Sequence, residues 1–157
     1  VSSGVASEGR QEFDVISNNI RDHLQRECAG SRILSAQGEL GDALGVSRVS
    51  SLDEAYCKIY WQKYSQDLGH YLRVVYHIFR FIDERGGSDK MFYSRIARGQ
   101  LSEGELIILF YNCVSRMGRK KFLPLAEEYD LFDNLNPKSL ADPSDQRLVR
   151  SRFADMY

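Results

Sequence analysis

Apolar residues recur every three or four positions through most of this chain, and the densest pattern runs from Leu68 to Arg85. At about 100° per residue, the apolar side chains of this stretch cover more than half of a helix surface. The main apolar face consists of Leu68, Tyr71, Leu72, Val75, Ile78, Phe79 and Ile82, and Val74, Tyr76 and Phe81 widen it. The pattern predicts a long, central and mostly buried helix.

A narrow polar row follows the same predicted helix in steps of three and four residues. Its members are His70, Arg73, His77, Arg80 and Glu84. One interpretation is structural, with these side chains pairing with Glu84 or other carboxylates along a helix–helix seam. The other is catalytic, because histidine can move protons near neutral pH and arginine can stabilise anionic oxygens.

Helical periodicity continues on both sides of this stretch. Ser102 and Glu105 form a capping-box pattern. The apolar run that follows them also has strand propensity, but the cap favours a buried helix that ends at Gly118. Residues 52–85 are predicted to form one long helix or two joined near Gly69, where we expect a bend or a close contact. The other predicted helices cover 11–28, 89–98 with Met91, Phe92 and Ile96 as the apolar side, a helix beginning at Pro124, and a last one from Asp142 with Leu148, Val149, Phe153 and Met156. The expected fold is all-α, a single compact helical domain of about five to seven helices around a long central helix.

The same pattern divides the chain into a leader and one domain. Residues 1–9 are small and polar, and we expect a disordered leader there. Residues 10–157 are expected to form the single helical domain, in which the Gly- and Ser-rich stretch 29–51 is a long connection with a short helix at 38–46. The chain begins at Val1 without an initiator Met, so we expect a longer parent protein.

Composition limits the classes of function. The 21 Lys and Arg against 22 Asp and Glu leave no global attraction for nucleic acid or anionic lipid. The three Cys lack the spacing of a metal site, so we expect the reduced thiols of a cytoplasmic domain, no metal and no cofactor. No apolar run is long enough to cross a bilayer.

Further polar residues stand out against the helical pattern. Asn112 lies within a strongly apolar stretch, where a buried amide requires hydrogen-bond partners and would help to specify the core. Arg98 and Gln100 precede the Ser102 cap and could border the same site. The basic cluster Arg116, Arg119, Lys120 and Lys121 could contact phosphates of RNA, DNA or lipid, or could complement a helix C-terminus.

Arg73 and His77 resemble the Arg/His pair of HEPN-type ribonucleases, which are helical themselves. The spacing here is shorter than in that family, and Val74 stands where a polar residue usually follows the Arg. This resemblance implies a metal-independent ribonuclease as the alternative function, with RNA as its partner.

A broader resemblance covers about half of the chain. The matching positions are His70, Tyr71, Arg73 and Tyr76, then Arg98, Gln100, Leu101 and Ser102, then Tyr111 and Asn112. These motifs are similar to those of the phage abortive infection family, the AbiC-like proteins of bacteria. Leu72 replaces an aromatic residue of the family pattern, and Gly99 replaces an alanine.

The resemblance implies antiphage defence through growth arrest or death of the infected cell. It implies a helical sensing, regulatory or effector module that responds to a phage-derived or host protein trigger, with an inner-membrane link through segments outside this chain. The motif residues are expected to meet in space as a buried network or a pocket. The oligomeric state and the toxic target are left open.

Overall fold

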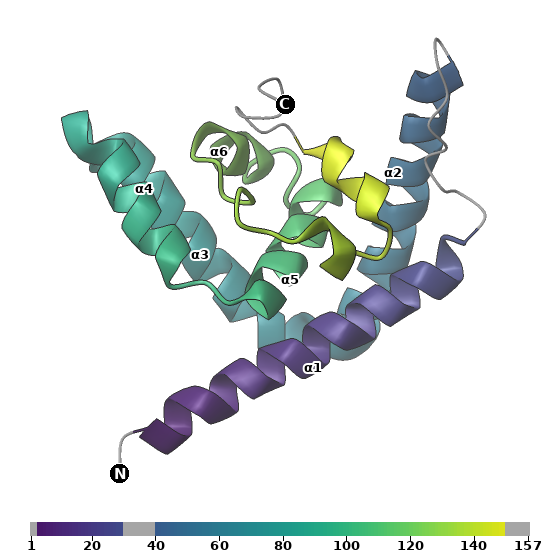
Figure 1. Cartoon of the computed structure of the whole chain (residues 1–157), viewed down its shortest axis with the longest axis horizontal. Helices are drawn as coiled ribbons and strands as arrows, with labels where there is room; N and C mark the ends of the chain where they lie inside the picture. Colours follow the sequence, from purple (N-terminus) through teal and green to yellow (C-terminus); the bar gives the residue numbers. More distant parts are fainter. Residues whose placement is uncertain (1–2, 30–39, 150–157) are drawn as a thin grey trace.

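The computed structural model describes residues 3–29 and 40–149, and in that part of the chain every regular element is helical (Figure 1). The α-helices are α1 (Ser3–Glu27), α2 (Leu40–Ile59), α3 (Ser65–Arg85), α4 (Lys90–Gly99), α5 (Glu103–Val114) and α6 (Leu123–Glu128). Short 3₁₀ segments lie at Gly87–Asp89, Pro137–Ser139 and Pro143–Leu148. The expected all-α fold is confirmed.

Helix α5 lies at the centre of the arrangement in Figure 1, between α1, α2, α3 and α6. Every residue from Leu106 to Val114 is buried, as the apolar run predicts. The capping box is present: the Ser102 hydroxyl accepts a hydrogen bond from the Glu105 amide, and the Glu105 carboxylate accepts one from the Ser102 amide at 2.8 Å. Two backbone donors at the helix start are thereby satisfied, which explains why the helix begins here.

Helices α2 and α3 are joined by a π-helical turn over Tyr60–Tyr64. Figure 1 shows the two helices leaving this turn in different directions, so the bend lies before Gly69. Gly69 makes the close contact that was the other expectation, because a Cβ at this position would lie 3.2 Å from the Tyr60 hydroxyl oxygen. A glycine therefore lets the turn pack closely against the first part of α3.

Several predicted boundaries differ from the structure. Helix α1 begins at Ser3, within the predicted leader. The short helix predicted at 38–46 is the first part of α2, which begins at Leu40 and continues through the rest of the predicted connection. Helix α5 ends at Val114, and the predicted last helix is a 3₁₀ segment whose cap is the Asp142 side chain. Phe153 and Met156 lie outside the described residues. The three Cys are free thiols.

The prediction that the Leu68–Arg85 helix is mostly buried is wrong. Leu68, Leu72, Val75, Phe79 and Ile82 face the core, but Val74, Ile78 and Phe81 are 41%, 44% and 66% exposed. Of the predicted apolar side of α4, only Met91 packs against the core. Phe92 and Ile96 are 61% and 51% exposed, while Ser94 is buried. Helices α3 and α4 pack side by side and each leaves apolar side chains on the outside.

Candidate functional site

The polar row of α3 lies on the surface of the molecule. His70, Arg73, His77, Arg80 and Glu84 are all exposed. Arg80 donates a hydrogen bond from Nε to Glu84 Oε1 at 2.7 Å, which is the pairing that the structural interpretation predicts for this residue. The row does not line a helix–helix seam, because the opposite face of α3 makes the contacts with the core.

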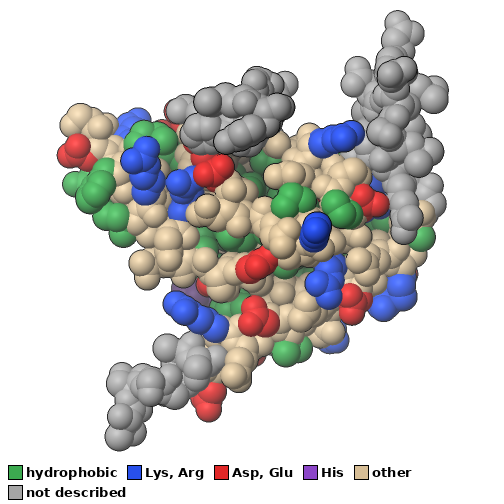
Figure 2. Space-filling model, viewed as in Figure 1, with side chains coloured by type: hydrophobic (Ala, Val, Ile, Leu, Met, Phe, Trp, Pro, Cys, Tyr) green, Lys and Arg blue, Asp and Glu red, His purple; other side chains and the backbone are tan. Residues whose placement is uncertain are grey.

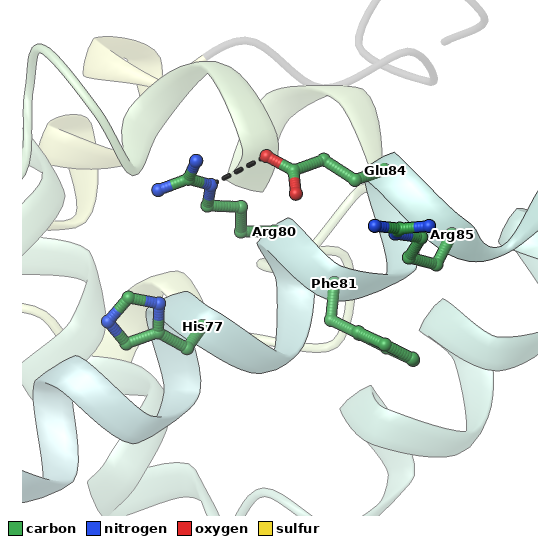
Figure 3. Close-up of a pocket in the computed structure, with 5 residues that line it drawn as sticks. All are labelled: His77, Arg80, Phe81, Glu84 and Arg85. Atoms are coloured by element: carbon green, nitrogen blue, oxygen red, sulfur yellow. Dashed lines mark hydrogen bonds and ion pairs between the residues drawn. The ribbon is translucent and has the colours of Figure 1, made fainter.

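Figure 3 shows five residues on this outer surface, His77, Arg80, Phe81, Glu84 and Arg85, around an open, shallow depression of about 650 Å³. Arg80 and Glu84 point to one side of α3, and Phe81 points to the other. The depression is thus bordered by both charged and apolar side chains. It lacks the enclosed shape that keeps water away from reacting groups.

Tyr71, in the first motif, contacts α1 and the start of α5. Its ring packs against Phe13 with centroids 4.5 Å apart. Burial, and then the charge of the neighbouring Glu105 carboxylate, raise the pKa of the Tyr71 hydroxyl. Tyr71 therefore connects α3 to the start of α5 and to α1 as part of the packing.

The remaining motif residues do not converge with the exposed row. Tyr76 packs against Phe122 with centroids 5.9 Å apart, and Arg98 donates from Nη1 to the backbone oxygen of Asp130 at 2.5 Å. Gln100 is exposed at the end of α4, where its backbone N–H donates a hydrogen bond to the Ala97 carbonyl at 3.2 Å. The structure thus joins these residues to separate parts of the chain and does not bring them into one pocket.

Asn112 is buried, as predicted, but on the side of α5 that faces α2. Its backbone oxygen accepts hydrogen bonds from the Gly118 amide at 3.0 Å and the Ser115 hydroxyl at 2.8 Å. Burial raises the pKa of Tyr56, and the adjacent Asn112 amide partly offsets that effect. Asn112 therefore helps to organise the end of α5 and its contact with α2.

Two residues of the basic cluster, Arg116 and Arg119, make contacts within the fold. Arg116 forms an ion pair with Asp53, with Nε and Oδ2 2.9 Å apart. Arg119 donates from Nε to the Val114 carbonyl at 2.9 Å and so satisfies the C-terminal end of α5, as the helix-end interpretation predicts. Lys120 and Lys121 are exposed, and their contact with phosphates stays a prediction.

Two features were not predicted from the sequence. The first is the apolar outer surface of α3 and α4, to which Val74, Ile78 and Phe81 contribute from α3, and Phe92, Tyr93 and Ile96 from α4. We call this the hairpin face. Figure 2 shows hydrophobic side chains gathered at the end of the molecule that α3 and α4 form.

The second feature is a buried polar network around Arg48. Its guanidinium donates to both carboxylate oxygens of Asp145 and, at 3.0 Å, to the Cys28 carbonyl. The Tyr111 hydroxyl donates to Asp145 at 3.0 Å and accepts from the Ala141 amide at 2.6 Å. Every polar atom named here has a partner, which is typical of a structural network.

The described residues contain no group of three or more His, Cys, Asp or Glu placed to hold a metal ion. Among them, too, no helix combines the length and the apolar character that a membrane span requires.

The chain was compared with curated proteins, solved structures and protein-family models. No curated protein and no solved structure matches it. A family model described as "Putative phage abortive infection protein" matches residues 63–140, from the π-helical turn through α6 to the 3₁₀ segment that follows it. The match includes every motif position on which the resemblance rests, from His70 to Asn112. Over residues 63–140, the chain belongs to the phage abortive infection family.

Proposed function

We propose that this chain is the interaction module of an abortive infection protein, and that it acts in phage defence by binding another macromolecule through the hairpin face. The observation that carries the proposal is the exposure of large apolar side chains on two adjacent helices, led by Phe81 at 66% and Phe92 at 61%. Single exposed apolar residues are common on protein surfaces, whereas a cluster of large ones usually marks a site of interaction.

The charged row beside the hairpin face supports the same function. His70, Arg73 and His77 border the apolar side chains of α3 along its length. An apolar centre with a charged edge is the usual composition of a binding surface, since the edge contributes specificity. A module of this kind could sense a phage-derived or host trigger, or pass the signal to an effector.

The test is a plaque assay in a host in which the full-length gene reduces plaque formation by a phage. Phe81→Asp places a charge in the middle of the hairpin face and is expected to restore plaques to nearly the level of a strain without the gene. The matched control is Val15→Asp, because Val15 is similarly exposed, at 59%, and belongs to α1, outside the hairpin face. Full protection by a folded Phe81→Asp protein would contradict the proposal.

Ribonuclease activity is the second candidate, because Arg73 and His77 lie one helical turn apart and are both open to a polyanion. The purified protein is incubated with labelled single-stranded RNA in the presence of EDTA. Cleavage that disappears in both Arg73→Ala and His77→Ala, together with loss of protection, would establish the ribonuclease. Protection by both variants would exclude that mechanism and leave the interaction module.

A further inference from the structure

Helix α3 carries two apolar stripes, and the fold uses one of them. The inner stripe packs on the core, whereas the outer one follows a different line of residues. Its members, alternately four and three residues apart, are Asp67, Tyr71, Val74, Ile78, Phe81 and Arg85. Tyr71 is half-buried and the other five are exposed. This alternation is the spacing by which one helix packs along another.

The two ends of the outer stripe carry opposite charges. Asp67 lies in the first turn of α3 and Arg85 in the last. If two such helices lie antiparallel, Asp67 faces Arg85 of the second copy at both ends of the contact. Val74 then faces Ile78 of the second copy, and Phe81 lies across from the position of Tyr71, whose ring packs against Phe13 of its own chain. A parallel arrangement would instead bring like charges together at each end, which is unfavourable.

The polar row fits the same arrangement. His70, His77 and Glu84 flank the outer stripe at intervals of seven residues. In the antiparallel pair, His70 lies across from Glu84 of the second copy, while His77 lies near the two-fold axis. The surface is therefore complementary to itself both in its apolar centre and in its charged edge, as a two-fold interface requires.

Helix α4 enlarges the surface. It packs along α3 and exposes Phe92, Tyr93 and Ile96, which are 46% to 61% exposed. The outer stripe alone extends about 27 Å, from a rise of 1.5 Å per residue. Two α3–α4 hairpins that pack together would form a four-helix arrangement, the usual way in which helical hairpins bury apolar faces of this kind.

We propose that the partner of the hairpin face is a second copy of this chain, with the two α3 helices antiparallel about a two-fold axis that passes between Val74 and Ile78. The inference rests on the proposed function, because it names the macromolecule that the same face binds.

The first test is the mass of the purified chain by sedimentation velocity at up to about 100 μM, where a micromolar dissociation constant is measurable. The expected mass is twice the 18.0 kDa of one chain. Phe81→Asp is expected to sediment as a monomer, because association would bury an unpaired charge. Val15→Asp is expected to remain a dimer. A wild-type monomer over this range would overturn the inference.

The second test uses charge reversal to determine the orientation. Asp67→Arg and Arg85→Asp, each alone, place like charges opposite one another and are expected to weaken the dimer roughly tenfold or more. The double variant restores opposite charges and is expected to recover the dimer. Both single changes also oppose the helix dipole of α3, so an effect on helix stability alone would make the double variant worse. Failure of the double variant to recover would overturn the antiparallel arrangement.

These results separate the inference from the proposed function. A monomeric wild-type protein that loses phage protection on Phe81→Asp would show that the face binds a different macromolecule. A dimer whose disruption by Phe81→Asp leaves protection unchanged would instead contradict the proposed function and leave the dimer standing.

Discussion

Arg48 and Asp145 form a two-fold hydrogen-bonded ion pair in the interior, with Nε to Oδ1 at 2.7 Å and Nη2 to Oδ2 at 2.9 Å. Their side chains are 2% and 0% exposed. The pair joins α2 to the final 3₁₀ segment, and Tyr111 connects it to the central helix. Removing one partner would leave the other as a buried, uncompensated charge.

We therefore expect Arg48→Met to lower the free energy of unfolding by about 3–5 kcal/mol. Urea denaturation followed by circular dichroism measures the change. The double variant Arg48→Met with Asp145→Leu is expected to lose less, because it leaves no unpaired charge. Arg21→Met is the control, since the Arg21–Asp22 pair lies on the surface and such pairs contribute about 0–1 kcal/mol. Equal losses in Arg48→Met and Arg21→Met would contradict this account.

Gly118 and Gly99 are a matched pair of glycines with opposite expectations. A Cβ at Gly118 would lie 2.6 Å from the backbone oxygen of Asn112, whereas at Gly99 nothing lies within 4 Å. Gly118→Ala is expected to cost about 1–3 kcal/mol, because the backbone beyond α5 must move. Gly99→Ala is expected to be neutral or to stabilise α4 by up to about 1 kcal/mol. The melting temperatures of the two variants, measured by thermal unfolding, test this expectation. Similar values would show that the contact between Gly118 and Asn112 is not tight.

Asp83 gives a prediction of pH dependence. The Tyr129 hydroxyl donates to its carboxylate at 2.6 Å, and this bond, followed by the charge of Lys90, lowers the pKa of Asp83 below its usual 3.8. A lowered pKa contributes stability above the unfolded value, and that contribution disappears as the pH falls through the folded value. In Tyr129→Phe the pKa of Asp83 should rise toward its usual value, as carboxyl chemical shifts would show in an NMR titration.

The stability difference between wild type and Tyr129→Phe should shrink as the pH is lowered from about 5 to about 2. Only the part of the stability difference that comes from the Asp83 charge disappears at low pH. The aromatic ring at position 129 packs against Phe79 in both proteins. An unchanged pKa of Asp83 in the variant would contradict the assigned cause.

The side chains of the polar row are exposed, so we expect that they can be substituted without unfolding the protein. Arg73→Ala and His77→Ala are expected to alter the free energy of unfolding by less than about 0.5 kcal/mol. Tyr71→Ala, in contrast, removes the ring that packs against Phe13 and should cost more than about 2 kcal/mol. If Arg73→Ala unfolded the protein, its side chain would have a structural role that its exposed position does not indicate.

Local signals in the sequence were sufficient to predict where α5 begins and that it is buried. Ser102 and Glu105 are three residues apart, and the apolar run begins next to them, so one stretch of chain specifies both the start and the burial of α5. Asn112 could be recognised as a buried amide for the same reason. The sequence did not reveal that Asn112 contacts Tyr56 and Gly118, because Tyr56 lies on another helix and Gly118 lies beyond the end of α5.

Periodicity predicted the side of α3 that faces the core, because the buried residues all belong to the main apolar face. It could not predict how wide the buried face is, since apolar residues surround more than half of this helix. Only the positions of the other helices determine that Val74, Ile78 and Phe81 stay exposed. The pairing of Arg48 with Asp145 was equally inaccessible, because 97 residues separate the two partners and neither belongs to a motif.

The π-helical turn at Tyr60–Tyr64 has a consequence for how proteins with this fold can vary. A π-helical turn contains about one residue more than an α-helical turn, so the number of residues in this turn sets the direction in which α3 continues from α2. Exchanging a side chain such as the exposed Trp61 leaves that number unchanged. Deleting one residue would merge the two helices into a continuous rod and carry the hairpin face to another side of the molecule. Natural variation at this joint should therefore consist of substitutions, while insertions and deletions should be confined to the loops.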